Sequence, residues 1–259
     1  MTTGPGGFDA LSGAGDGADP ATPPPYGIRT MAPQPPITAA RMVLVRHGEA
    51  VCNVSGVCGG PLGCQGLTER GHLQVEGLRD RLAASGELAG ADALYASVLP
   101  RAVETAELLA PALRSVGPGS KLGPPLDVVS ECGLCELHPG DADGLSWSEF
   151  TARFGALDWD DDPGQPIAPG GESWTGFVNR VSASLDKLAV DHPGQLVVVA
   201  CHAGVIEASL LAKLPIANGL DGARLQLRTA HASMTTWEVD NDRWRLLAYN
   251  DSAAAGPVR

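Results

Sequence analysis

A run of five apolar residues, Leu196-Val197-Val198-Val199-Ala200, narrows the possible folds of this chain more than any other segment. It lacks polar residues at alternate positions, which is typical of a strand buried on both faces. Met42-Val43-Leu44-Val45 is a second run of the same kind. Strands of this type occur mainly in parallel sheets that helices cover on two sides. The two runs therefore favour an α/β protein.

Helical patterns alternate with such strands along the chain. Thr68 can cap a helix with an apolar side formed by Leu73, Val75, Leu78 and Leu82. We expect further helices to begin at Pro100, at Ser173 and at Gly204, with a short helix at 147–154. The remaining expected strands are 93–96, 126–129 and an antiparallel pair at 234–239 and 244–249. This order predicts a three-layer α/β/α sandwich with a mostly parallel central sheet.

The ends of the chain lack these patterns. Residues 1–40 contain seven Gly and eight Pro but no apolar periodicity, so buried surface cannot offset the entropy of ordering them. We therefore predict a disordered Pro/Gly-rich tail at 1–40, one domain at 41–250 and a short C-terminal tail at 251–259.

Charge and composition restrict the partners of the protein. The net charge is −12, from 18 Lys and Arg and 30 Asp and Glu, so a broad basic face for nucleic acid is not expected. No apolar stretch is long enough to cross a bilayer, so we expect no membrane partner. The first residues lack a basic segment followed by an apolar run, which predicts a cytoplasmic protein with reduced thiols. A homodimer is left open.

Two histidines follow the two buried runs. His47 comes directly after Arg46, and His202 comes directly after Cys201. Each is followed within two residues by a glycine, which permits a close approach of the backbone to a ligand. Ligands of open parallel sheets bind outside the carboxyl ends of the strands. The two histidines and Arg46 can therefore meet over one crevice.

Five segments resemble, in order, the motifs of the histidine phosphatase superfamily, also called the phosphoglycerate mutase-like family. The likeness covers most of residues 42–250. A lone Arg-His-Gly tripeptide recurs by chance, whereas five segments in family order form a specific signal. The segments are Arg46-His47-Gly48-Glu49, Leu67-Thr68-Glu69-Arg70-Gly71, Pro100-Arg101-Ala102-Val103-Glu104-Thr105-Ala106, Pro169-Gly170-Gly171-Glu172-Ser173 and Val199-Ala200-Cys201-His202-Ala203-Gly204-Val205-Ile206.

The resemblance implies a role for each side chain of the crevice. His47 is the expected nucleophile, which becomes a phosphohistidine, and His202 is expected to donate to the transferred phosphoryl group. The expected phosphate ligands are Arg46, Asn53 and Arg101, together with the backbone at Gly59 and Ala203. No metal and no other cofactor are expected, because these groups supply the positive field.

Protonation of the leaving alkoxide requires a general acid. Two carboxyl groups, Glu136 and Glu131, are candidates. The segment from Glu136 to Gly144 reproduces the spacing of the family segment in this region, with Asp143 in place of a later Glu. We therefore assign the acid to Glu136 and keep Glu131 as the alternative.

These assignments imply a metal-independent phosphomonoesterase of the histidine acid phosphatase type, acting on a small phosphorylated metabolite. One alternative is a cofactor-dependent phosphoglycerate mutase, which the acidic segment 158–162 disfavours because that enzyme needs a more basic pocket. Another is a non-catalytic protein that only binds phosphorylated ligands, which the complete set of site residues disfavours.

The six cysteines suggest a further class of protein. Cys132-Gly133-Leu134-Cys135 has the spacing of a metal or redox site, and Cys52, Cys58 and Cys64 could in principle complete a zinc site. No second Cys-x-x-Cys pair exists, so we expect no metal there. His138 and His231 differ from the residues that are common in the family; a structural role is expected for each, with an effect on the choice of substrate as the alternative. Trp147 and Trp174 are expected to lie in the core.

Overall fold

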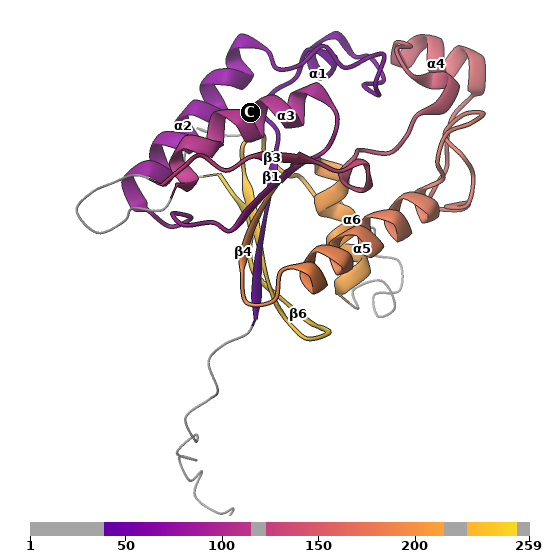
Figure 1. Cartoon of the computed structure of the whole chain (residues 1–259). Helices are drawn as coiled ribbons and strands as arrows, with labels where there is room; N and C mark the ends of the chain where they lie inside the picture. Colours follow the sequence, from indigo (N-terminus) through magenta and orange to yellow (C-terminus); the bar gives the residue numbers. More distant parts are fainter. Residues whose placement is uncertain (1–38, 115–122, 215–226, 253–259) are drawn as a thin grey trace, which may run out of the picture. The chain divides into compact units, whose positions relative to one another are not determined.

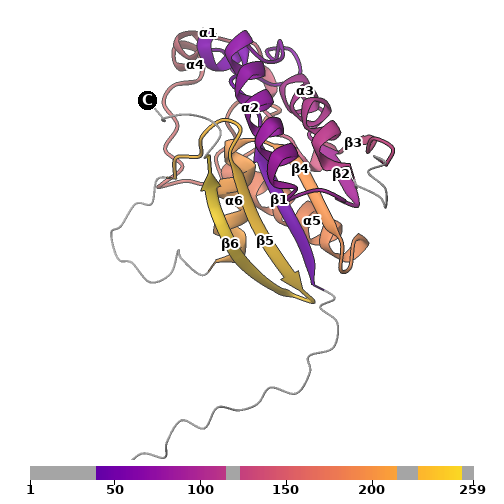
Figure 2. The same cartoon turned by 90° about the vertical axis from the view of Figure 1, so that its left-hand side faces the viewer.

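A six-stranded sheet forms the centre of the fold (Figure 1), and its strand order is β3-β2-β4-β1-β5-β6 (Figure 2). The computed structural model describes residues 39–114, 123–214 and 227–252. Four strands run parallel: β1 (Ala40–Arg46), β2 (Ala93–Ala96), β3 (Val128–Ser130) and β4 (Leu196–Cys201). The antiparallel edge is formed by β5 (Met234–Asp240) and β6 (Arg243–Asp251). The predicted mostly parallel sheet is confirmed.

Helices cover both faces of this sheet (Figure 2). One face packs against α2 (Glu69–Ser85) and α3 (Pro100–Leu109), with Val43, Val75 and Leu109 in a common core. The other face packs against α5 (Trp174–Asp191) and α6 (Ala203–Lys213), with Leu44, Phe177 and Ile206 in a second core. The predicted three layers are therefore present. The shorter helices are α1 (Val51–Ser55), α4 (Trp147–Phe154) and 3-10 turns at Ala110–Leu113, Cys132–Leu134 and Gly140–Ala142.

Side-chain caps fix where the helices begin. The Thr68 hydroxyl accepts a hydrogen bond from the Gly71 amide, and the Ser173 hydroxyl accepts one from the Gly176 amide. Gly86 ends α2 in the left-handed conformation, with φ of +67°. One residue of the expected apolar side is placed wrongly, because Leu73 is 62% exposed at a position that α2 turns away from the sheet.

The expected boundaries of the domain shift slightly at both ends. β1 begins at Ala40, which is buried, so this strand includes the last residue of the predicted tail. β6 extends to Asp251, the first residue of the predicted C-terminal tail. The rest of the two predicted tails, apart from residues 39 and 252, lies outside the described residues. Within the described part of the chain, no helix combines the length and the apolar composition required to cross a membrane.

Candidate active site

The parallel pairing of β1 with β4 brings the two strand-end histidines together. Arg46 and Cys201 are partners in the register, so His47 and His202 leave adjacent strands at the same level. The His47 amide extends this pairing by donating to the Cys201 carbonyl over 2.9 Å. The ring centroids of His47 and His202 are 5.1 Å apart, and both side chains are buried.

Arg101 joins the two imidazoles. It is the second residue of α3, directly after the turn that follows β2, and it is buried. Its Nε lies 3.2 Å from His47 Nε2 and 3.2 Å from His202 Nδ1. Its Nη1 donates to the Gly59 carbonyl over 2.7 Å, which fixes the plane of the guanidinium. The positive charge of the Arg101 guanidinium therefore lies between the imidazole rings of His47 and His202.

The hydrogen bonds define the tautomers of both histidines. His47 Nδ1 lies 2.6 Å from the Gly48 carbonyl, which can only accept, so Nδ1 carries the proton and Nε2 keeps a lone pair. His202 Nδ1 faces the donor Arg101 Nε, so the proton of a neutral His202 ring is on Nε2. The site thus presents one imidazole as a base or nucleophile and the other as a donor.

Burial keeps both rings neutral. It is the largest cause that lowers the pKa of His47 well below the usual value, and the charge of Arg101 is the next. The pKa of His202 is lowered well below its usual value by the same two causes. The pKa of His231 is lowered to about 4, mainly by burial. Its ring lies 5.8 Å from that of His47, so His231 borders the predicted site, which favours the alternative that it affects the choice of substrate.

Two donors in this site are left without partners. The described residues contain three buried side-chain polar atoms that make no hydrogen bond, and two of them are Arg46 Nε and His202 Nε2. Arg46 is held by its Nη1, which donates to the Thr229 carbonyl. Buried donors normally have a partner, so a pair of them beside Arg101 indicates a site for an anion.

A pocket of about 370 Å³ opens onto these groups. Its cationic lining side chains are Arg46 and Arg101. The wall is otherwise largely apolar or neutral, and it includes all the predicted site residues except His202. The lining residues are Arg46, His47, Cys52, Asn53, Val57, Cys58, Gly59, Gly60, Arg101, Glu136, Leu137, Pro139, Trp147, Trp159, Ile167, Trp174 and Ala203.

The weaker predicted phosphate ligands also lie at the pocket. Asn53 Oδ1 accepts from the Ala50 amide over 3.0 Å, which leaves its NH₂ group available to a ligand. Gly59 contacts the side chain of Cys52 so closely that an added Cβ would lie 2.6 Å from Sγ. Ala203 is the first residue of α6, where the amide N–H has no carbonyl partner within the helix.

The two candidate acids occupy different places. Glu136 lines the pocket, and its carboxylate accepts from the Gly204 amide over 3.2 Å. Glu131 lies outside the pocket lining and accepts from the Gly133 amide over 2.9 Å as a cap of the following turn. This arrangement favours Glu136 over Glu131.

Three tryptophans contribute to the wall of the pocket. Trp147 and Trp174 were expected in the core, and Trp159 had no predicted role. Trp147 is 53% exposed, so the prediction that it lies in the core is wrong. Trp159 and Trp174 stack with centroids 5.8 Å apart. A signal was present in the sequence, because three of its five tryptophans fall within the irregular 130–174 region that follows the site motifs.

Comparisons with known proteins agree with this geometry. Over 220 residues the chain is 28% identical to phosphoglycerate mutase-like protein 4 of Arabidopsis thaliana, covering 82% of this chain and 85% of that one. It is 28% identical over 208 residues to a metal-independent phosphoserine phosphatase of the same plant, covering 77% and 79%. The structure of a mycobacterial glucosyl-3-phosphoglycerate phosphatase in complex with VO3 is 29% identical, with a TM-score of 0.61 over 82% of this chain and 99% of that one.

A family model describes the same region. The model of the histidine phosphatase superfamily (branch 1) matches residues 42–252, which include both histidines, both arginines and the sheet that carries them. Because that match spans most of the protein, this chain belongs to the histidine phosphatase superfamily.

Proposed function

We propose that the protein is a metal-independent phosphomonoesterase that hydrolyses a small phosphorylated metabolite through a phosphohistidine on His47. Membership of the superfamily and the phosphatases among its relatives support a phosphatase. The observation that carries the proposal is the pair of buried imidazoles, of opposite hydrogen-bonding character, on either side of Arg101.

The first half-reaction transfers the phosphoryl group to His47. The Nε2 lone pair attacks phosphorus while the ester oxygen leaves, and the Nδ1 proton is held by the Gly48 carbonyl. Arg46, Arg101 and the Nε2 proton of His202 stabilise the equatorial oxygens, and Glu136 gives its proton to the leaving oxygen. In the second half-reaction Glu136 takes a proton from water, which attacks phosphorus and releases His47.

The charges and walls of the pocket support a monophosphate as substrate. Two arginines suffice for one phosphate group, and among the described residues the pocket lining offers no lysine or third arginine for a second one. Trp159, which lies within the acidic segment 158–162, contributes to the wall beyond the phosphate site. A bisphosphorylated ligand would bring extra negative charge toward the aspartates of segment 158–162, and this repulsion disfavours the mutase reaction.

A trapping experiment tests the mechanism. The purified full chain, screened against phosphorylated metabolites, should release inorganic phosphate and keep doing so in EDTA. Rapid quenching with a labelled substrate should give an acid-labile, base-stable phosphoenzyme. His47→Ala should abolish it and lower kcat/KM by at least about a thousandfold, whereas His72→Ala, at a half-buried position of α2 outside the pocket lining, should retain both.

Three outcomes would contradict the proposal. A turnover rate of His47→Ala close to that of the wild type would rule out His47 as the nucleophile. Isomerisation of 3-phosphoglycerate in the presence of 2,3-bisphosphoglycerate, with little free phosphate, would favour the mutase. Binding of phosphate esters without turnover of any of them would favour a phospho-ligand-binding protein.

A further inference from the structure

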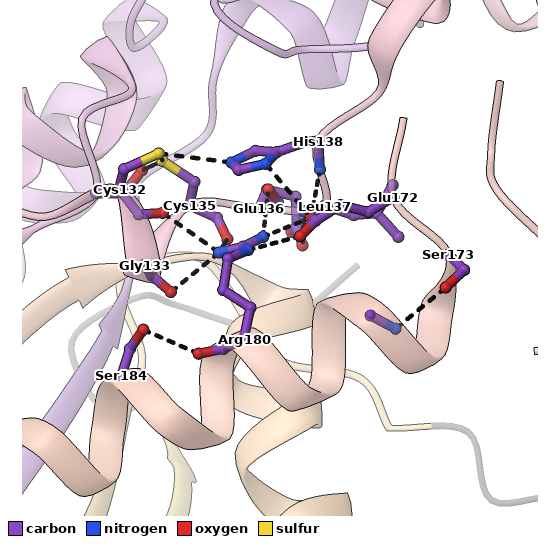
Figure 3. A network of polar contacts seen from close by, with 12 residues as sticks. Cys132, Gly133, Cys135, Glu136, Leu137, His138, Glu172, Ser173, Arg180 and Ser184 are labelled. Atoms are coloured by element: carbon purple, nitrogen blue, oxygen red, sulfur yellow. Dashed lines mark hydrogen bonds and ion pairs between the residues drawn. The ribbon is translucent and has the colours of Figure 1, made fainter. Parts of the chain in front are cut away.

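A second cluster of reactive side chains lies next to the pocket without lining it. Cys132 and Cys135 belong to the loop after β3, and His138 follows three residues later (Figure 3). All three ligand atoms lie within 4.8 Å of one another. The absence of a second Cys-x-x-Cys pair disfavoured a metal here, but His138 supplies a third ligand atom beside the first pair.

The distances in this cluster match those around one tetrahedral ion. Cys132 Sγ and Cys135 Sγ are 3.8 Å apart, and Cys132 Sγ is 3.6 Å from His138 Nε2. With Zn–S of about 2.3 Å and Zn–N of about 2.1 Å, a tetrahedral Zn²⁺ has S···S edges of about 3.8 Å and S···N edges of about 3.6 Å. Two of the edges of the coordination tetrahedron are therefore already in place.

The loop that holds the ligands is fixed from outside. Arg180 of α5 donates through Nη1 to the carbonyls of Cys132, Gly133 and Cys135, over 3.3, 3.0 and 3.1 Å (Figure 3). The same guanidinium makes two hydrogen bonds of 2.7 Å to the Glu172 carboxylate. One arginine thus orients the backbone of both cysteines before any ion binds.

A carboxylate also stands behind the histidine. Glu172 Oε2 accepts from the His138 amide over 2.9 Å and lies 3.7 Å from His138 Nδ1. Nε2 is the nitrogen that faces Cys132, so the nitrogen near Glu172 is the one that a metal would leave free. Histidines that bind metals commonly have such an arrangement, in which a carboxylate orients the ring through its second nitrogen.

We propose that Cys132, Cys135 and His138 form a Zn²⁺ site that fixes the loop carrying Glu136. Binding releases the two thiol protons to solvent, so the two thiolates neutralise the ion, and water completes the fourth position at the exposed Cys132. Glu136 lies between Cys135 and His138 in the chain, and Glu136, Leu137 and Pro139 face the pocket. The ion would hold this segment of the pocket wall in place and would take no part in phosphoryl transfer.

Metal binding can be measured without enzyme activity. The full chain is stripped with chelator under a reductant that does not bind metals, and its six free thiols are counted after denaturation. We expect it to take up one equivalent of Zn²⁺, and to give with Co²⁺ a thiolate charge-transfer band and the intense visible bands of a tetrahedral ion. Zn²⁺ should also slow amide hydrogen exchange in residues 131–139.

Matched variants identify the ligands. Cys132→Ser and His138→Gln should each lower the Zn²⁺ affinity at least about tenfold. With Co²⁺, Cys132→Ser should weaken the thiolate charge-transfer band, and His138→Gln should shift the visible bands of the tetrahedral ion, whereas Cys58→Ser and His72→Gln should keep both the affinity and the spectrum. The melting temperatures of the metal-free variants show that the fold is intact. The proposal would be overturned if the reduced wild-type protein did not bind Zn²⁺. It would also be overturned if Cys132→Ser kept the ion and His231→Gln lost it, because the ion would then bind beside the histidines of the pocket.

Discussion

The reactivity of His47 arises from what surrounds its two ring nitrogens. The Gly48 carbonyl holds the Nδ1 proton at 2.6 Å, and Arg101 approaches Nε2 at 3.2 Å. Burial in a positive environment makes protonation of this ring costly, so the lone pair is available where an ordinary histidine would already be half charged. The nucleophile that we propose is thus neutral before the substrate binds.

This environment predicts an unusual pH dependence of the rate. The pKa of His47 is lowered well below 6.5, chiefly by burial, so its neutral form persists on acidification. For a substrate whose own phosphate does not titrate in the range, kcat/KM should not fall as the pH drops from about 7 to about 6. A tenfold loss across that interval, with the protein still folded by circular dichroism, would contradict a neutral buried nucleophile.

The position of Glu136 predicts a dependence on the leaving group. Glu136→Gln keeps the shape of the side chain but cannot deliver a proton, so hydrolysis of an alkyl phosphate should slow by about 10²- to 10⁴-fold. An aryl phosphate, whose leaving oxygen needs little protonation, should be affected much less. Glu131→Gln serves as the matched control and should leave the ratio of the two rates unchanged. Equal losses for both esters would argue against Glu136 as the acid.

At the level of elements, the first turn of α2 supports the catalytic loop. A Cβ built on Gly71 would lie 2.0 Å from the Glu49 carbonyl oxygen, and one built on Gly48 would lie 2.4 Å from the Gly71 carbonyl oxygen. Thr68 adds a hydrogen bond of 2.9 Å from its hydroxyl to the Glu49 carboxylate. The backbone next to His47 is therefore held directly against the helix.

A pair of glycine substitutions tests this support. Gly71 and Gly176 are both third residues of a helix, and both donate to the capping hydroxyl. Gly176 has no neighbour closer than 3.3 Å to an added Cβ, so Gly176→Ala should be neutral or slightly stabilising in urea unfolding. Gly71→Ala should lower the free energy of unfolding by about 1–3 kcal/mol and reduce kcat. Similar stability and activity of the two variants would contradict the contact.

The elements differ in how well a sequence alone could predict them. β1 and β4 are continuous apolar runs, so their ends, and with them His47 and His202, could be located from residue types alone. Trp147 could not, because it lies on the same face of α4 as the buried Phe150, with ring centroids 5.6 Å apart, and the sequence does not reveal that this face ends at a pocket. The spacing of Cys132 and Cys135 is visible in the sequence, but the orientation of their loop depends on Arg180, which lies 48 residues further along the chain.

At the level of the whole molecule, the sheet concentrates all the chemistry at one edge. The carboxyl ends of β1 and β4 carry the two imidazoles, the segment after β2 supplies Arg101, and the loop after β3 supplies Glu136. Parallel order makes this possible because all four strands end on the same side. The consequence is that several ionisable groups are buried together, so the stability of the fold depends on their protonation.

The buried histidines predict a loss of stability on mild acidification. In the unfolded chain a histidine has a pKa of about 6.5, whereas the pKa values of folded His47 and His202 lie well below this and that of His231 is about 4. Between these values the unfolded state binds more protons, so the free energy of unfolding rises with pH and falls as the pH drops below about 6.5. Each buried ring that titrates fully in the unfolded state contributes a slope of at most about 1.4 kcal/mol per pH unit.

Urea unfolding between about pH 8 and pH 5 measures this slope directly. The midpoint should be nearly constant above pH 7 and should fall below it at an unchanged m value. His231→Gln, which removes one of the three rings while leaving His47 and His202 in place, should make the decline shallower. A midpoint that is flat or rises toward pH 5 in the wild type would mean that the rings accept protons in the folded state, and the neutral nucleophile inferred from the contacts of His47 would have to be abandoned with it.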